Sequence, residues 1–87
     1  MMNNHYRTGK HEVDTISTML LDGRDYSTIE GAYIYNIIKY IGRCNEKGSR
    51  EQDLIKAIEY LMMMLRMKSK NRDKVKQLIK ECLDNDK

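Results

Sequence analysis

The segment 36–43, Asn-Ile-Ile-Lys-Tyr-Ile-Gly-Arg, constrains the fold most, because its isoleucines and polar residues recur at the spacing of an amphipathic helix. Asn36, Lys39 and Arg43 fall on one side of such a helix, since residues three or four apart are surface neighbours. The isoleucines between them point toward a core. No proline interrupts the chain. The sequence therefore predicts helices that carry a polar cluster beside a buried apolar stripe.

The segment 53–61 repeats this arrangement. Asp53, Lys56 and Tyr60 share one face of a helix. The other, apolar face carries Leu54, Ile58 and Leu61. Two helices that each present a polar cluster predict a shared site for an anion, and a nucleotide phosphate is the leading candidate.

The fold class predicted from this periodicity is all-α, a small four-helix bundle in one domain. Residues 1–10 form an N-terminal arm, residues 11–84 the helical domain, and residues 85–87 a frayed tail. The first three helices are expected to span about 11–21, 27–46 and 50–68, and the fourth starts after Asn71.

Helix boundaries are predicted from capping residues. Ser27 and Ser49 begin the second and third helices, each followed three residues later by an acidic or amide residue in a capping-box pattern. Gly23 and Gly48 are expected to end the first and second helices, because glycine readily adopts the left-handed conformation found there.

The expected core does not include all the apolar residues, so some apolar side chains are expected on the surface. The second helix is expected to bury Ile34, Ile37, Ile38 and Ile41, widened by Tyr33 and Cys44. The third helix is expected to bury Leu61, Met62 and Leu65 and to leave Met63, Met64 and Met67 partly outside. Methionine-rich surface suits adaptable protein contacts, and a domain of this size has a thin core. We therefore expect a homo-oligomer, most simply a dimer through the third or fourth helix.

Composition excludes several partners. The net charge of +3 is too small, without a concentrated patch, to predict nucleic-acid binding. The longest apolar run, residues 61–65, is far shorter than a membrane span, and the polar N-terminus shows no signal peptide. Cys44 and Cys82 are too far apart in sequence to indicate a disulfide framework and are typical of thiols in a reducing compartment. A cytoplasmic location without membrane contact follows.

Motifs for catalysis and metal binding are absent from the sequence. It has no glycine-rich phosphate loop, no paired-cysteine or His-Glu-x-x-His pattern, and no helical acidic cluster for magnesium. We therefore expect no metal ion, no cofactor and no turnover of ATP. Arg43 can hold a phosphate through two parallel hydrogen bonds, and Lys39 acts as a point charge.

Each candidate has a second interpretation. Lys39 and Arg43 could form an exposed basic face paired with Asp53 or Glu30, which contributes only about 0–1 kcal/mol. Tyr40 and Tyr60 could stack on a base or pack as half-buried core. The N-terminal arm, with histidines at positions 5 and 11, could be solvated or could fold over the site and offer an imidazole to a ligand.

Several motifs together resemble a family of small phage proteins of unknown function, which is similar to part of the nucleotide kinase of T7-like phages. They are His5-Tyr6, Gly9, Glu12, Asn36-x-x-Lys39-Tyr40-x-x-Arg43, Lys47, and Asp53-Leu54-x-Lys56-Ala57-x-x-Tyr60-Leu61. The resemblance implies ligand-binding roles for His5, Tyr6, Glu12, Asn36, Lys39, Tyr40, Arg43, Asp53, Lys56 and Tyr60.

The resemblance implies a phage origin and a nucleotide-related role. The leading hypothesis is a phage protein that binds a nucleotide or a nucleotide-derived signal and sequesters it from host defence. One alternative is a nucleoside monophosphate kinase. Another is an interaction protein that inhibits a host factor through its methionine-rich surface. A binder or an enzyme requires the polar residues of the second and third helices to converge, whereas an inhibitor of that kind does not.

Overall fold

The computed structural model describes residues 7–8, 11–22, 24, 26–46 and 48–86 of the 87-residue chain. These residues form helices α1 (Val13–Leu21), α2 (Thr28–Arg43), α3 (Arg50–Met64) and α4 (Ser69–Asn85), preceded by the two-residue strands β1 (Arg7–Thr8) and β2 (His11–Glu12). The strands pair antiparallel, with Arg7 opposite Glu12 and Thr8 opposite His11. The predicted all-α class and small helical bundle are confirmed.

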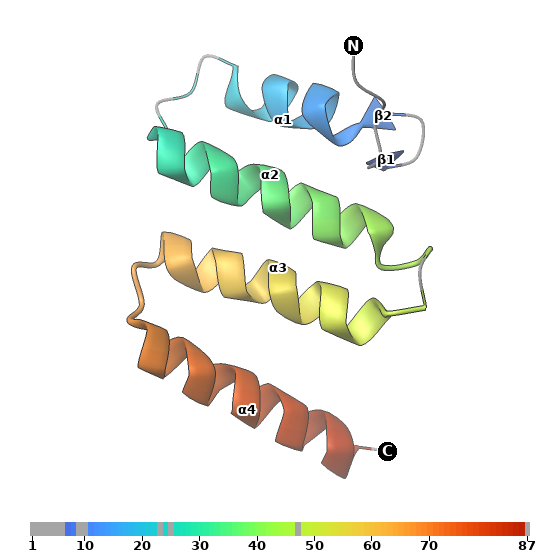
Figure 1. Ribbon diagram of the computed structural model, residues 1–87, viewed down its shortest axis with the longest axis vertical. Coiled ribbons are helices and arrows are strands. Elements are labelled where there is room, and N and C mark those ends of the chain that lie inside the picture. The colour runs from blue at the N-terminus through green and yellow to red at the C-terminus, as the bar shows by residue number, and fades with distance from the viewer. Residues whose placement is uncertain (1–6, 9–10, 23, 25, 47, 87) are drawn as a thin grey trace.

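The four helices lie side by side in chain order (Figure 1). The molecule measures 43 × 29 × 18 Å, so its shortest dimension is not much larger than the diameter of one helix with its side chains. The contact between α2 and α3 is the most extensive, and the contact between α3 and α4 is much smaller. No described helix is both long and apolar enough to cross a membrane.

Four helix boundaries differ clearly from the sequence prediction. His11 and Glu12 form β2, so α1 starts at Val13 rather than at residue 11. Helix α2 ends at Arg43 instead of continuing to residue 46. Helix α3 ends at Met64 because Arg66 adopts a left-handed conformation, with φ of 64°. The resulting turn lets α4 start at residue 69, three residues earlier than expected.

One predicted serine N-cap is present and the other is wrong. The hydroxyl of Ser27 accepts a hydrogen bond from the backbone N–H of Glu30 at 3.1 Å, as the pattern requires. The Ser49 hydroxyl makes no such bond to the helix backbone; it donates to the carboxylate of Asp53 instead. Gly48 has the expected left-handed conformation, with φ of +71°, but it does not end α2, whose C-cap is Cys44. Gly23 lies outside the described residues.

The core is small and lies mainly between neighbouring helices. Its buried apolar members are Val13, Ile34, Cys44, Ile55, Ala57 and Met62. Three residues expected in the core are exposed instead: Ile41, Leu61 and Leu65. Helices arranged in a layer bury the sides that face their neighbours, and residues that point out of the layer stay in solvent. Met62 is buried as predicted, and Met63, Met64 and Met67 are half-buried.

Candidate functional site

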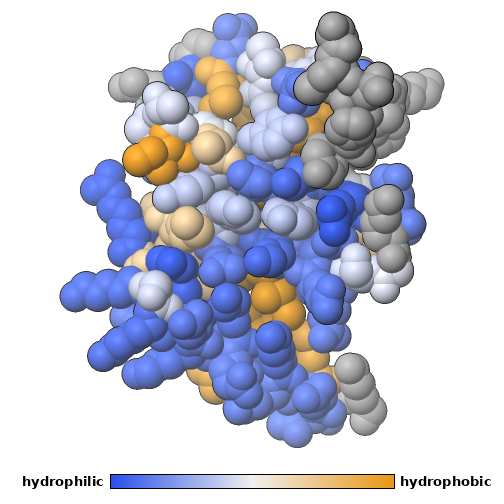
Figure 2. All heavy atoms as spheres, in the orientation of Figure 1, coloured by the Kyte–Doolittle hydropathy of each residue, from blue (hydrophilic) through white to orange (hydrophobic). Residues whose placement is uncertain are grey.

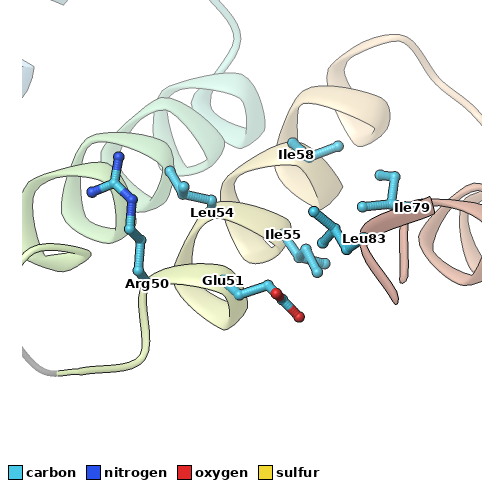
Figure 3. A pocket seen from close by; sticks show the side chains of 7 residues that line it. All are labelled: Arg50, Glu51, Leu54, Ile55, Ile58, Ile79 and Leu83. Atoms are coloured by element: carbon cyan, nitrogen blue, oxygen red, sulfur yellow. The ribbon is translucent and has the colours of Figure 1, made fainter. Parts of the chain in front are cut away.

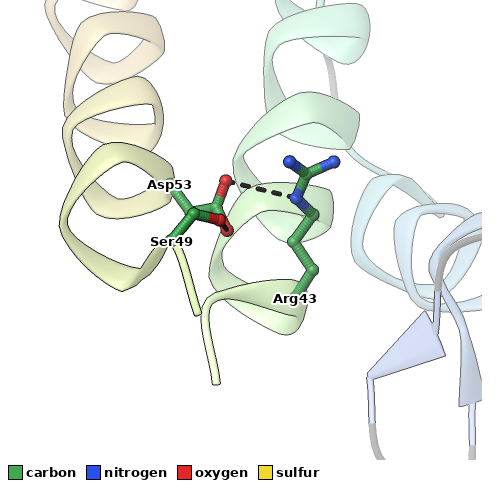
Figure 4. A network of polar contacts seen from close by, with 3 residues as sticks. All are labelled: Arg43, Ser49 and Asp53. Carbon is green, nitrogen blue, oxygen red and sulfur yellow. Dashed lines mark hydrogen bonds and ion pairs between the residues drawn. The ribbon is translucent and has the colours of Figure 1, made fainter. Parts of the chain in front are cut away.

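A buried carboxylate joins the end of α2 to the start of α3 (Figure 4). The Nε of Arg43 donates to Oδ1 of Asp53 at 3.2 Å, and the Ser49 hydroxyl donates to Oδ2 at 3.0 Å. Asp53 is only 2% exposed, whereas the Arg43 side chain is 34% exposed. Both carboxylate oxygens therefore have partners, as a buried charge requires. Arg43 pairs with Asp53, which was one of the two pairings expected for a basic face.

The short connection between α2 and α3 brings these residues together. Arg43 is in the last turn of α2 and Asp53 in the first turn of α3, so each charge also suits the helix dipole at its position. Arg50 holds the connection: its Nη1 donates to the side chain of Asn45 and lies 3.6 Å from the Cys44 Sγ. Cys44, at the start of this connection, is buried in the core.

The Arg43 guanidinium is oriented so that its terminal nitrogens are directed away from the carboxylate (Figure 4). Neither terminal nitrogen makes a hydrogen bond to another described residue. The guanidinium carbon lies 5.4 Å from the centre of the Tyr40 ring, and the Lys39 ammonium lies 4.8 Å from the same centre. Contacts of this kind between cations and a ring are attractive. The arrangement places two cations beside one aromatic ring, with one of them held by a buried acid.

Three tyrosines form a row between α2 and α3. The ring centres of Tyr40 and Tyr60 are 6.2 Å apart with 18° between the planes, and those of Tyr33 and Tyr60 are 5.9 Å apart at 45°. All three residues are half-buried. The rings of Tyr40 and Tyr60 therefore contact each other, and the structure favours their interpretation as half-buried packing.

The alkaline pH dependence of stability is expected to report on this row. Burial, followed by the neighbouring Tyr40 and Glu59, raises the pKa of Tyr60 above its ordinary value of 10.0. The folded state favours the neutral phenol, so this contribution to stability is complete below about pH 10 and is lost as the pH rises through the folded pKa. In urea unfolding at several alkaline pH values, Tyr60→Phe should lose less stability with pH than the parent protein. Equal losses would contradict this expectation.

The other predicted site residues lie in different surroundings. Asn36 donates from Nδ2 to the carbonyl of Ala32 at 2.9 Å, a bond within its own helix. Lys56 is exposed and lines a hollow between α3 and α4, together with Lys76 and Lys80. No described contact joins Lys56 to Arg43. Glu12 is half-buried at the start of α1.

The N-terminal arm is partly ordered against the helices. Strand β1 packs on α2 and pairs with β2, as an arm folded over the helices would do. His5 and Tyr6 lie outside the described residues, and so does the Lys47 that carried part of the resemblance. Among the described residues, no three His, Cys, Asp or Glu side chains lie close enough together to hold a metal ion.

Sequence reasoning missed the role of Ser49. The position of Ser49 before α3 predicted a helix cap. Instead, the Ser49 hydroxyl donates a hydrogen bond to the buried carboxylate of Asp53, four residues later. The sequence feature that could have indicated this role is a carboxylate at a helix position that faces another helix. Such a carboxylate needs several hydrogen-bond donors. Arg43 and Ser49 provide two of them.

Comparison with protein families gives one match. A family described as a protein of unknown function, DUF3310, matches residues 2–62, which is more than two thirds of the chain. The chain belongs to the DUF3310 family. The DUF3310 region includes Arg43, Ser49, Asp53 and the tyrosine row, and it ends before α4. No curated protein and no solved structure matches the chain.

Proposed function

We infer that this protein binds a nucleotide or a nucleotide-derived ligand through its phosphate, with Arg43 as the principal phosphate contact and Lys39 as a second cation. The observation that carries this proposal is the arginine held at Nε by a buried aspartate while its terminal nitrogens are directed away from it (Figure 4). Two parallel terminal N–H groups match a phosphate well.

The electrostatics of the site support an anion over a cation. Asp53 is engaged by Arg43 and Ser49, so its negative charge serves to position the guanidinium. Lys39 lies against the same ring as Arg43, and two nearby cations favour a ligand with more than one negative charge. A guanidinium that is already oriented has less side-chain entropy to lose on binding.

The resemblance to part of the T7-like nucleotide kinase is the reason to choose a nucleotide among phosphate ligands. On this proposal the protein is phage-encoded, acts in the cytoplasm of the host cell and removes a nucleotide signal from host defence.

Substitution of Arg43 tests the proposal. In calorimetric titrations with nucleoside mono- and triphosphates and cyclic dinucleotides, Arg43→Ala should weaken binding by about ten- to a hundredfold, because a hydrogen bond to a charged group is worth about 1.5–3 kcal/mol. Arg43→Lys keeps the charge but loses the planar pair of donors, so its affinity for these ligands should lie between that of the parent protein and that of Arg43→Ala.

The matched control is Arg66→Ala, which removes an exposed arginine from the turn between α3 and α4. It should bind like the parent protein. Absence of binding to any of these ligands at millimolar concentration, or equal loss in both arginine variants, would refute the proposal. Formation of nucleoside diphosphate from a monophosphate, ATP and magnesium would favour the kinase instead.

A further inference from the structure

An apolar groove runs between α3 and α4 (Figure 3). It has a volume of about 500 Å³. Its lining residues are Arg50, Glu51, Leu54, Ile55, Ile58, Ile79 and Leu83. In the close view Ile79 and Leu83 project from α4 toward Ile55 and Ile58 of α3. We call this feature the α3–α4 groove; it does not include Arg43 or the tyrosine row.

Exposed leucines extend the α3–α4 groove along both helices. Leu54, Ile58, Leu61 and Leu65 follow one another at intervals of four, three and four residues, which keeps them on one side of α3. Leu65 is 74% exposed, and Leu78 on α4 is 59% exposed. A side of a helix that carries several large exposed apolar residues in line is typical of an interaction surface.

The opposite side of the contact between α3 and α4 is polar. Ile55 lines both the groove and a second hollow, whose other residues are Glu51, Gln52, Lys56, Glu59, Lys76 and Lys80. Lys76 and Glu59 form an ion pair there at 3.2 Å. Figure 2 shows one face of the molecule, where hydrophilic side chains predominate over α3 and α4 and surround a small apolar patch. The pair of helices thus has one apolar side and one polar side.

Helix α4 is the least buried of the four helices. None of its residues is buried, and α3 is its only helical neighbour among the described residues. Most helical stability in proteins comes from packing an apolar face against other elements rather than from the helix alone. The apolar residues of α4 have the spacing of such a face: Val75, Leu78, Ile79, Cys82 and Leu83. A partner that covers this face would provide the missing burial.

The charges beside this face fit a second copy of the same helix in antiparallel orientation. Lys74 and Glu81 are seven residues apart and flank Leu78 on the same side of α4. They are too distant to pair within one helix, and Glu81 accepts a hydrogen bond from Nε2 of Gln77 at 3.2 Å. When two α4 helices run antiparallel about a twofold axis, Lys74 lies beside the partner's Glu81. The symmetry repeats this contact, so the interface contains two such pairs. A parallel pair would place like charges opposite each other.

We propose that the α3–α4 groove is the interface of a homodimer, in which two α3–α4 hairpins pack face to face about a twofold axis and the two α4 helices run antiparallel. Such an interface is self-complementary, as twofold symmetry requires. Helix α4 is about 25 Å long, and two adjacent helices are about 20 Å wide, so the pair covers about 500 Å² per copy. The total of about 1,000 Å² is the size at which specific interfaces begin.

Sedimentation equilibrium of the purified chain from about 1 to 200 µM tests the proposal. The parent protein should be dimeric at the upper concentrations. Leu78→Glu should weaken dimerisation at least a hundredfold, because the carboxylate would be buried without a partner. Gln52→Glu adds the same charge at an exposed position on the polar side of the α3–α4 contact and should leave the dimer intact. Leu78 is exposed in the single chain, so circular dichroism should show both variants folded.

A charge exchange distinguishes the antiparallel arrangement from any other. Glu81→Lys alone should weaken the dimer about tenfold, and the double variant Lys74→Glu/Glu81→Lys should restore it. A parent protein that stays monomeric at 200 µM, or a dimer that Leu78→Glu leaves unchanged, would overturn the proposal. Failure of the double variant to restore association would overturn the antiparallel pairing. None of these results depends on nucleotide binding.

Discussion

Replacement of Asp53 with alanine is expected to lower the free energy of unfolding by about 2–4 kcal/mol. The carboxylate is buried and bonded to Arg43 and Ser49, so its removal leaves a half-buried hydroxyl without its acceptor and a guanidinium without its counter-ion. Breaking a buried ion pair costs about 3–5 kcal/mol. We expect a smaller loss because Arg43 is 34% exposed and regains water.

Urea unfolding at a constant protein concentration provides the measurement. Asp53→Asn keeps the shape and one accepting oxygen, so it should lose about half as much stability as Asp53→Ala. The matched control is Asp73→Ala, which removes an acid that is 72% exposed and paired with Lys76 on the surface. It should change stability by less than about 1 kcal/mol. Similar losses in Asp53→Ala and Asp73→Ala would show that the buried position of Asp53 is unimportant.

The Asp53 variants also test whether the aspartate orients Arg43 for ligand binding. If the aspartate orients Arg43, its loss should weaken nucleotide binding even under conditions in which the variant is fully folded. A guanidinium that must be ordered by the ligand binds less tightly, because the ordering cost is paid on binding. Unchanged affinity in folded Asp53→Asn would mean that Arg43 needs no such support.

Replacement of Ile34 with alanine is expected to cost about 2–4 kcal/mol, the range found for large-to-small changes in packed cores. Ile34 is 6% exposed and is the buried side chain of α2. The same substitution at Ile41, seven residues later on the same helix, should cost less than about 1 kcal/mol. Ile41 is 49% exposed, so little apolar surface returns to water when it is shortened.

Thermal and urea unfolding of the two isoleucine variants test whether the helices form a layer. Ile34 and Ile41 are the same residue type with the same helical propensity, so their difference isolates burial. Equal losses would indicate that Ile41 is also covered in solution. Because Ile41 is outside the α3–α4 groove as described, that result would point to a different packing of α2.

The architecture of the site was only partly predictable from sequence. Helical spacing placed Lys39 and Arg43 together, and in the structure both lie beside the Tyr40 ring. The same spacing grouped Asn36 with them, although its amide is used by the carbonyl of Ala32. Spacing indicates which residues share a side of a helix, but it does not indicate which polar side chains are hydrogen-bonded to the backbone of that same helix.

Lys56 illustrates a second limit of the sequence. It is three residues from Asp53 and was grouped with it, yet Asp53 is buried against α2 and Lys56 lines the hollow toward α4. Residues three apart on a helix differ by about 60° in direction. A difference of that size can place neighbours on either side of a helix–helix contact, and only the position of the adjacent helices decides the outcome.

The sequence by itself determined the helices, the Ser27 cap and the pair of segments that carry the polar residues, because local spacing and capping depend on residues a few positions apart. The tertiary structure decided which apolar residues are buried. Ile41, Leu61 and Leu65 match the helical pattern of a core, but a layer of helices leaves them in solvent. It also decided that Ser49 and Arg43 meet one buried carboxylate, since the hydrogen bonds of a buried charge depend on how two helices face each other.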